Sequence, residues 1–149
     1  MKKIVLFALL AALPLTAMAD AKEEAVEARH GFYNMLGINM NVLAGMARGE
    51  IAYDEAAASK AGANIEALTG YALPDLFPEG TAHGEYDDSY ARPAIWSNRD
   101  DFAAKYDGLV QAAAGTAEAV KGGQGNVGPV VQKLGGACKA CHDSYRQPE

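Results

Sequence analysis

Apolar residues recur at helical spacing along four stretches of the chain. In the first stretch the apolar seam repeats every seven residues, with leucines between the repeats, and its members are Val26, Tyr33, Leu36, Met40, Leu43 and Ala47. The polar run at 48–50 ends this helix. The second stretch follows Asp54, whose carboxylate suits an N-cap, and continues to about Tyr71.

The third stretch starts near Ser97, which forms a capping-box pattern with Asp100, and continues to the glycine-rich residues 122–126. The fourth carries Pro129 in its first turn and ends near Tyr145. Short connections after the first and third stretches make those neighbours antiparallel. The pattern therefore predicts an all-α fold, an antiparallel up-down-up-down four-helix bundle, and bundle interiors are where such folds build cofactor sites.

The segment between the second and third stretches, residues 72–97, has no helical period and is rich in proline and glycine. A connection of this length usually crosses one end of a domain or has a function of its own. We expect four apolar residues to pin it over an end of the bundle: Leu73, Leu76, Phe77 and Trp96.

The first 19 residues have the pattern of a secretory signal peptide, with a basic start, an apolar run and the small-residue site Ala17-Met18-Ala19. The apolar run is too short to span a bilayer comfortably, and nothing later resembles a membrane span. We therefore expect residues 20–149 to form one exported domain in the periplasm.

The mature chain is acidic. Loss of Lys2 and Lys3 with the signal peptide leaves 11 basic and 19 acidic residues, a net charge of −8. This charge argues against nucleic acid and anionic membrane surfaces as partners.

The run Cys138-Lys139-Ala140-Cys141-His142 near the C-terminus is the attachment pattern of a c-type haem. The two thiols are spaced to form thioethers with the haem vinyl groups, and the histidine supplies one axial nitrogen to the iron. On a helix all three side chains project from one face. We therefore expect one covalently bound haem c per chain, attached through Cys138 and Cys141 with His142 as the iron ligand.

Three other interpretations of these cysteines fit less well. A thioredoxin-like site expects a βαβ neighbourhood, which the sequence does not show. A structural zinc site needs four ligands, and beyond this run only His30 and His83 are available. A disulfide across two residues of a helix would be strained.

One basic residue interrupts the apolar seam of the first helix. Arg29 lies at a core-type position between Val26 and Tyr33, where an unpaired guanidinium is costly. It either snorkels to solvent from the helix start or makes a charge-assisted contact with a haem propionate. The second interpretation accounts for the buried charge.

The geometry of the bundle indicates which residue faces the iron. The first and fourth helices run antiparallel, so the start of the first lies beside His142. At 1.5 Å per residue, Tyr33 lies at the matching depth, with Leu36 lining the pocket. Met40 lies deeper and is expected in the ordinary core.

These pieces resemble the cytochrome c′ family over essentially the whole mature chain. The matching elements are the run from Cys138 to Arg146, the Arg29-x-x-x-Tyr33 pattern, and the motif at 91–97 that begins Ala91-Arg92-Pro93. A C-x-x-C-H motif alone identifies only a c-type haem. Its position near the C-terminus, together with the other two elements, makes the resemblance specific.

The resemblance implies five-coordinate, high-spin iron, with His142 on the proximal side and Tyr33 on the distal side. It also implies that Arg29 contacts a propionate and that Arg146 lies near the proximal face. Leu36 stands where a methionine is common in the family, so the resemblance does not determine the shape of the pocket. A homodimer through the first two helices is the expected assembly.

The expected function is therefore that of a haem protein that binds small diatomic gases (NO, CO) and has a second capacity to exchange electrons with a redox partner protein. The alternative is a low-spin electron-transfer cytochrome with Met35 or Met40 as sixth ligand. An enzyme such as a peroxidase needs a distal acid–base residue. We expect His30 and His83 to be surface histidines, so this class fits less well. A class I cytochrome c expects a methionine after the haem motif, and none follows His142.

Overall fold

The computed structural model describes residues 16–148. Residues 1–15, which hold most of the predicted signal peptide, lie outside the described part, so that prediction and the domain limits at 19 and 20 stay predictions. Within residues 16–148 no helix is both long and apolar enough to cross a membrane.

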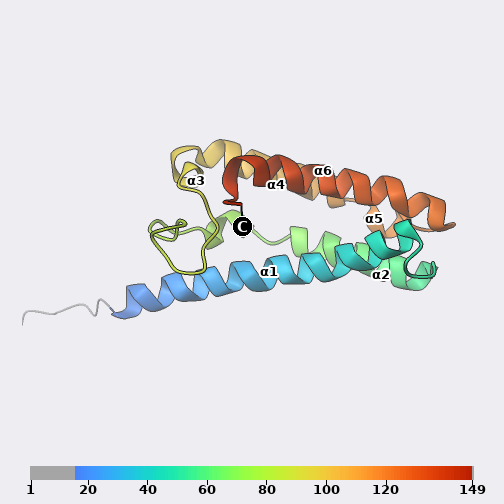
Figure 1. Cartoon of the computed structure of the whole chain (residues 1–149), viewed down its shortest axis with the longest axis horizontal. Coiled ribbons are helices and arrows are strands. Elements are labelled where there is room, and N and C mark those ends of the chain that lie inside the picture. Colours follow the sequence, from blue (N-terminus) through green and yellow to red (C-terminus); the bar gives the residue numbers. More distant parts are fainter. Residues whose placement is uncertain (1–15, 149) are drawn as a thin grey trace, which may run out of the picture.

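Four long helices form the predicted bundle (Figure 1). They are α1 (Thr16–Arg48), α2 (Glu55–Thr69), α4 (Arg99–Ala113) and α6 (Val127–Tyr145). Helix α1 packs against α2 and α6, and α4 packs against α6 and α2, so the four helices enclose one core. The up-down-up-down topology expected from the sequence is confirmed.

Short elements complete the chain between the long helices. They are the 3-10 turns η1 (Leu73–Leu76) and η2 (Gln124–Asn126) and the one-turn helices α3 (Ala94–Ser97) and α5 (Thr116–Ala119).

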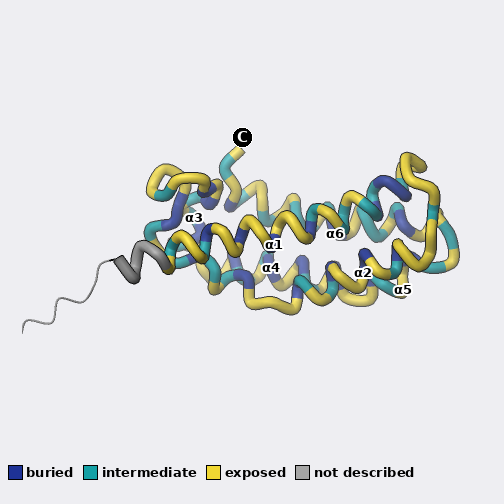
Figure 2. Tube along the Cα trace, turned by 90° about the horizontal axis from the view of Figure 1, so that it is seen from below, coloured by how far each residue is buried: buried dark blue, intermediate teal, exposed yellow. Residues whose placement is uncertain are grey.

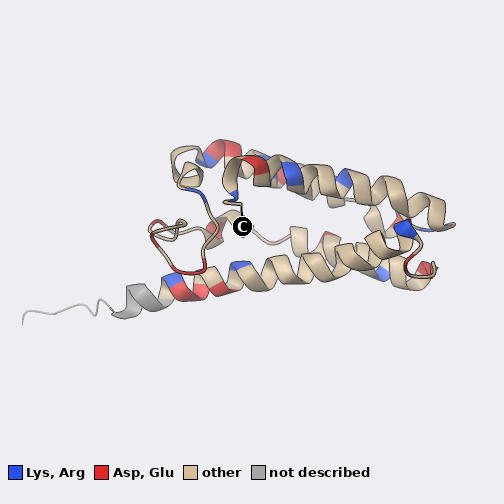
Figure 3. Cartoon of the chain, viewed as in Figure 1, with Lys and Arg blue, Asp and Glu red and all other residues tan. Residues whose placement is uncertain are grey.

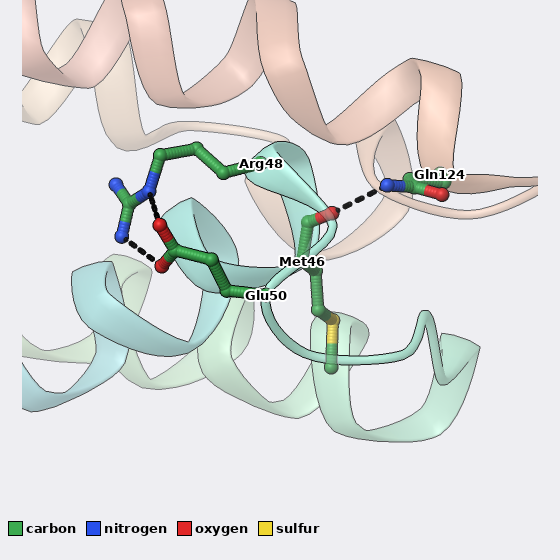
Figure 4. Close-up of polar contacts among 4 residues, drawn as sticks. All are labelled: Met46, Arg48, Glu50 and Gln124. Atoms are coloured by element: carbon green, nitrogen blue, oxygen red, sulfur yellow. Dashed lines mark hydrogen bonds and ion pairs between the residues drawn. The ribbon is translucent and has the colours of Figure 1, made fainter.

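Both ends of the turn between α1 and α2 are fixed by side chains. The carboxylate of Asp54 accepts a hydrogen bond from the Ala57 N–H at 2.7 Å, which confirms the predicted N-cap. At the end of α1, Arg48 donates two hydrogen bonds to the Glu50 carboxylate, at 2.8 and 2.7 Å (Figure 4). The amide of Gln124 donates to the Met46 carbonyl at 2.8 Å and ties the α5–α6 connection to the same corner.

The third predicted helix is divided into two pieces, α4 and α5. The capping-box prediction was wrong, because Asn98 is the N-cap of α4 and the Ser97 hydroxyl donates instead to the Ala94 carbonyl at 3.4 Å. Gly115, with φ of 78°, separates α4 from α5. The Glu66 carboxylate of α2 then accepts from the Ala117 N–H at 2.8 Å and fixes the start of α5.

The buried residues lie along the inward faces of the four long helices (Figure 2). At one place two backbones come unusually close: a Cβ on Gly62 of α2 would lie 2.8 Å from the backbone of Ala117. Any larger residue at 62 would push α5 away from α2.

The long segment between α2 and α3 covers the end of the bundle at which α6 ends (Figure 1). Leu73 and Phe77 are buried in the core, and the ring of Phe77 meets that of Phe102 with centroids 4.8 Å apart. The indole of Trp96 donates to the Phe77 carbonyl at 3.1 Å, and Leu76 packs against the core. The predicted pinning of this segment is confirmed.

Candidate functional site

A cavity of about 670 Å³ opens between α1, α4 and α6. Its inner walls are mostly apolar, and the residues that form them include Leu36, Leu73, Ile95, Phe102, Tyr106 and Leu109. Such a volume and lining suit a large, flat, mainly apolar cofactor. This cavity is where the structure brings the predicted site residues together.

Helix α6 contributes Cys138, Cys141 and His142, which all line the cavity. The two thiols are free and half-buried. Burial raises the pKa of the Cys138 thiol and raises that of Cys141 to about 11. Both cysteines are therefore neutral thiols at pH 7, unlike the low-pKa thiolate of a thioredoxin-type site.

The neutral form of His142 is also favoured. Burial lowers the pKa of its imidazole, and the positive charge of Arg146 lowers it further. A neutral imidazole keeps a nitrogen lone pair available for a metal. Among the residues that the structure describes, no three His, Cys, Asp or Glu side chains are grouped as they would be around a metal ion.

Tyr33 faces His142 across the cavity. Their ring centroids are 6.3 Å apart, at an interplanar angle of 66°. Tyr33 is 36% exposed, but it lines the cavity, and burial raises the pKa of its hydroxyl. Leu36, one turn further along α1, is buried and lines the same wall.

Arg29 is the buried charge that the sequence pointed to. The residue is 4% exposed, and both terminal nitrogens of its guanidinium are buried without a hydrogen-bond partner. Its guanidinium carbon lies 4.4 Å from the centre of the Phe77 ring, and burial lowers the pKa of Arg29. A buried cation with two unused donors at a cavity wall fits the carboxylate of a bound cofactor, such as a haem propionate.

Arg146 is the C-cap of α6, one turn after His142, and lines the cavity on that side. Its guanidinium carbon lies 5.6 Å from the centre of the Tyr90 ring.

The remaining predicted candidates are spread more widely. Met35 is 49% exposed and lies in a different groove, between α1 and α2. Met40 packs against the core, as expected, but it also lines the cavity, which the sequence did not indicate. His30 is exposed and lies at the rim of the cavity, whereas His83 is exposed in the long segment.

The lining residues that the sequence analysis did not indicate include Tyr90 and Lys105. Tyr90 directly precedes the Ala91-Arg92-Pro93 motif, and that adjacency was the available signal. Lys105 continues the inward face of α4 defined by Phe102 and Tyr106, and its ammonium lies 3.8 Å from the Asp101 carboxylate.

The family model described as Cytochrome C′ matches residues 24–146. A cytochrome c′ of Cereibacter sphaeroides is 39% identical over 146 residues and covers 98% of both chains. A cytochrome c-554 of the same organism is 40% identical over 143 residues, covering 96% of this chain and 94% of its own.

Solved structures give the same result for the fold. A cytochrome c′ from Rhodobacter Spheriodes superposes with a TM-score of 0.82 at 37% identity, over 86% of this chain and 98% of its own. A cytochrome c′ described as having an unusual ligand-controlled dimer dissociation superposes with a TM-score of 0.75 at 29% identity, over 85% and 97% of the two chains.

Proposed function

Because the chain belongs to the cytochrome c′ family, we propose that it is a periplasmic haem protein that binds small diatomic gases such as NO and CO at an open axial site, with electron exchange as a second capacity. Members of this family carry one covalently bound haem c per chain, and the chain is a c-type haem protein. The bound haem supplies an iron centre for ligand binding and one-electron chemistry.

The residues present suit this cofactor. Cys138 and Cys141 would form the two thioethers, and the neutral imidazole of His142 would bind the iron. The two unsatisfied nitrogens of Arg29 would bind a propionate. Arg146 would lie on the proximal side, beside His142.

The single observation that carries the gas-binding proposal is that Tyr33, not a methionine, faces His142. A phenol kept neutral by burial is a poor iron ligand, which favours five-coordinate iron. A cofactor held between these two rings would place Tyr33 beside its open face, so a further ligand would need Tyr33 to move.

Binding rather than catalysis is the proposed activity. A peroxidase needs an acid–base group above the metal, and the residue in that place is Tyr33, whose pKa is raised.

The alternative is a low-spin electron-transfer cytochrome with methionine as sixth ligand. Met40 is a candidate for this sixth ligand because it lines the cavity. However, Met40 lies seven residues, or roughly 10 Å, further along α1 than Tyr33. Met35 lies in the α1–α2 groove, away from His142.

We also propose a homodimer through α1 and α2. An apolar groove runs between these helices, and its exposed members include Met35, Ile38 and Tyr71. Phe32 lines this groove and also meets Tyr33 edge-on, with centroids 5.5 Å apart. Displacement of Tyr33 by a ligand would therefore press on the dimer surface, in keeping with the ligand-controlled dissociation named for one structural relative.

Absorption spectra of the purified ferric and ferrous protein, with and without CO or NO, test the proposal. We expect high-spin spectra before ligand is added and a ferrous CO complex afterwards. A low-spin six-coordinate spectrum without added ligand would instead establish the methionine-ligated alternative. Detection of the mature protein in the periplasmic fraction tests the location.

A further inference from the structure

A short strap, residues 89–92, connects the long segment to the end of the haem-motif helix. The Gln147 N–H donates to the Tyr90 carbonyl at 2.7 Å, and the Arg92 N–H donates to the Tyr145 carbonyl at 2.9 Å. Ala91 and Arg146 form an antiparallel bridge between these two bonds. The strap therefore pairs, like a short strand, with the residues that follow His142.

Hydrogen bonds to earlier residues of the long segment also hold the strap in place. Ser89 is buried, and its hydroxyl donates to the Thr81 carbonyl at 2.6 Å. The His83 N–H donates to the Ala91 carbonyl at 2.7 Å. Because these bonds lie mostly in buried surroundings, the strap has little freedom to move away from α6.

The side chain of Tyr90 faces the charge of Arg146. Its ring contacts the Arg146 guanidinium at 5.6 Å and stacks with the His83 ring, with centroids 6.4 Å apart and planes at 17°. The Nδ1 of His83 is in turn hydrogen-bonded to the Ser89 carbonyl at 2.9 Å. Tyr90, Arg146 and His142 all line the same cavity.

These contacts give Tyr90 a definite effect on Arg146. A guanidinium is attracted to the face of an aromatic ring, and a ring that is itself fixed limits where the long arginine side chain can go. The ring of Tyr90 is therefore a contact that keeps the charge of Arg146 at the cavity rim.

We propose that Tyr90 is a positioning residue that holds the Arg146 guanidinium beside His142 and thereby raises the reduction potential of the site. The inference rests on the proposed function, in which His142 binds the haem iron. A positive charge held near the iron favours the reduced state, and a charge that moves into solvent is screened. The long segment thus has an electrostatic role at the site as well as covering the bundle.

A double-mutant cycle on the haem-loaded protein tests this inference. The variants are Tyr90→Leu, Arg146→Met and the two combined, and the measurement is the reduction potential. We expect Tyr90→Leu and Arg146→Met each to lower the potential, and Tyr90→Leu to have no further effect when Arg146 is already Met. Tyr90→Phe keeps the ring and should keep the potential of the parent.

Controls separate this role from a structural one. Tyr86→Leu removes a tyrosine of the same segment that lies near Glu23 and Glu27 instead, and should leave the potential unchanged. If Tyr90→Leu lowers the potential equally with and without Arg146, or if it lowers only the stability to denaturant, the inference is wrong. A parent protein whose spectrum shows no histidine-ligated haem would contradict the proposed function itself, before any variant is compared.

Discussion

The ring of Tyr33 meets the ring of His142 at 66°, with 6.3 Å between the centroids. These residues come from opposite ends of the chain and converge because α1 and α6 pack side by side. If the haem occupies the space between these rings, as proposed, Tyr33 is the side chain that an incoming ligand would have to displace.

Tyr33→Ala should bind carbon monoxide more tightly or faster than the parent. Removing the ring removes the cost of displacing a packed side chain, about 1–3 kcal/mol, or roughly 5- to 150-fold in affinity. CO titration and stopped-flow mixing of the ferrous protein measure it. Tyr33→Phe keeps the bulk and should behave like the parent, whereas weaker binding by Tyr33→Ala would identify the hydroxyl as a donor to the ligand.

Arg29→Met should lower the reduction potential, because the substitution keeps length and apolar character while removing the charge. A unit charge roughly 10 Å from the iron at an effective dielectric constant of about 20 is worth about 1.7 kcal/mol. For one electron this is on the order of 70 mV. Redox titration of the haem-loaded variant measures the shift.

Arg48→Met is the matched control for that experiment. Arg48 lies at the other end of α1, 19 residues from Arg29, and is exposed and paired with Glu50 (Figure 4). Figure 3 shows that basic residues occur toward both ends of α1. A surface charge at such a distance is screened by salt, so the potential should not change. Equal potentials for Arg29→Met and the parent would mean that Arg29 does not contact the cofactor.

Mass spectrometry of the denatured periplasmic protein should give the mass of the mature chain plus one haem, because thioethers survive denaturation. Replacing Cys138 or Cys141 with alanine should impair maturation. Extraction of the haem into acidified solvent would contradict covalent attachment.

Ile38→Glu should shift the protein from dimer to monomer. Ile38 is 65% exposed within the α1–α2 groove, and a carboxylate there would be desolvated in the interface without a partner. Sedimentation velocity measures the change. Ile51→Glu introduces the same charge at an exposed isoleucine outside the groove and should leave the dimer intact. A parent protein that is monomeric would contradict the dimer proposal.

Tyr106→Phe should make the protein less sensitive to alkaline unfolding. Burial raises the pKa of Tyr106 to about 12, and its hydroxyl donates to the Tyr71 and Thr69 carbonyls at 2.7 and 3.1 Å. Since the folded-state pKa is above the unfolded value of 10.0, this stability is complete below about pH 10 and is lost as pH rises to about 12.

Denaturant unfolding at several pH values measures this effect. The variant should lose about 1–2 kcal/mol at neutral pH, because two carbonyls lose their donor, and should show a shallower fall between pH 10 and 12. Tyr145, whose pKa is also raised to about 12 by its hydrogen bond to Asp101, still titrates there, so the fall should be reduced but not abolished.

The four-helix bundle could be predicted because an apolar stripe with helical period indicates a helix that buries one face. The break at Gly115 was missed because the apolar pattern continues through it, with Ala113 and Val120 both buried. The start of α4 was predicted to within one residue, but the predicted capping box was wrong because it is a purely local pattern. The structure instead uses Asn98, which ends α3 and begins α4 at once.

The candidate site, like the fold, could be predicted only in part from the sequence. Arg29 and Tyr33 could be predicted to lie in one cavity with His142, because each interrupts or occupies a helical seam at a calculable depth. The contact between Tyr90 and Arg146 could not, because it depends on backbone pairing between an aperiodic segment and residues 145–147. No periodicity marks such a pairing.

The cavity lies between the first and last helices, and this has a consequence for how the protein is made. A chain synthesised from its N-terminus presents α1 long before α6 exists, so Tyr33 has no partner until nearly the whole chain has been produced. Until then the inward face of α1, with Leu36 and Leu43, lacks the helix that covers it. Apolar surface on such an incomplete chain is open to aggregation. Completion of the site must therefore follow synthesis of the last helix, and a nascent chain needs protection until that point.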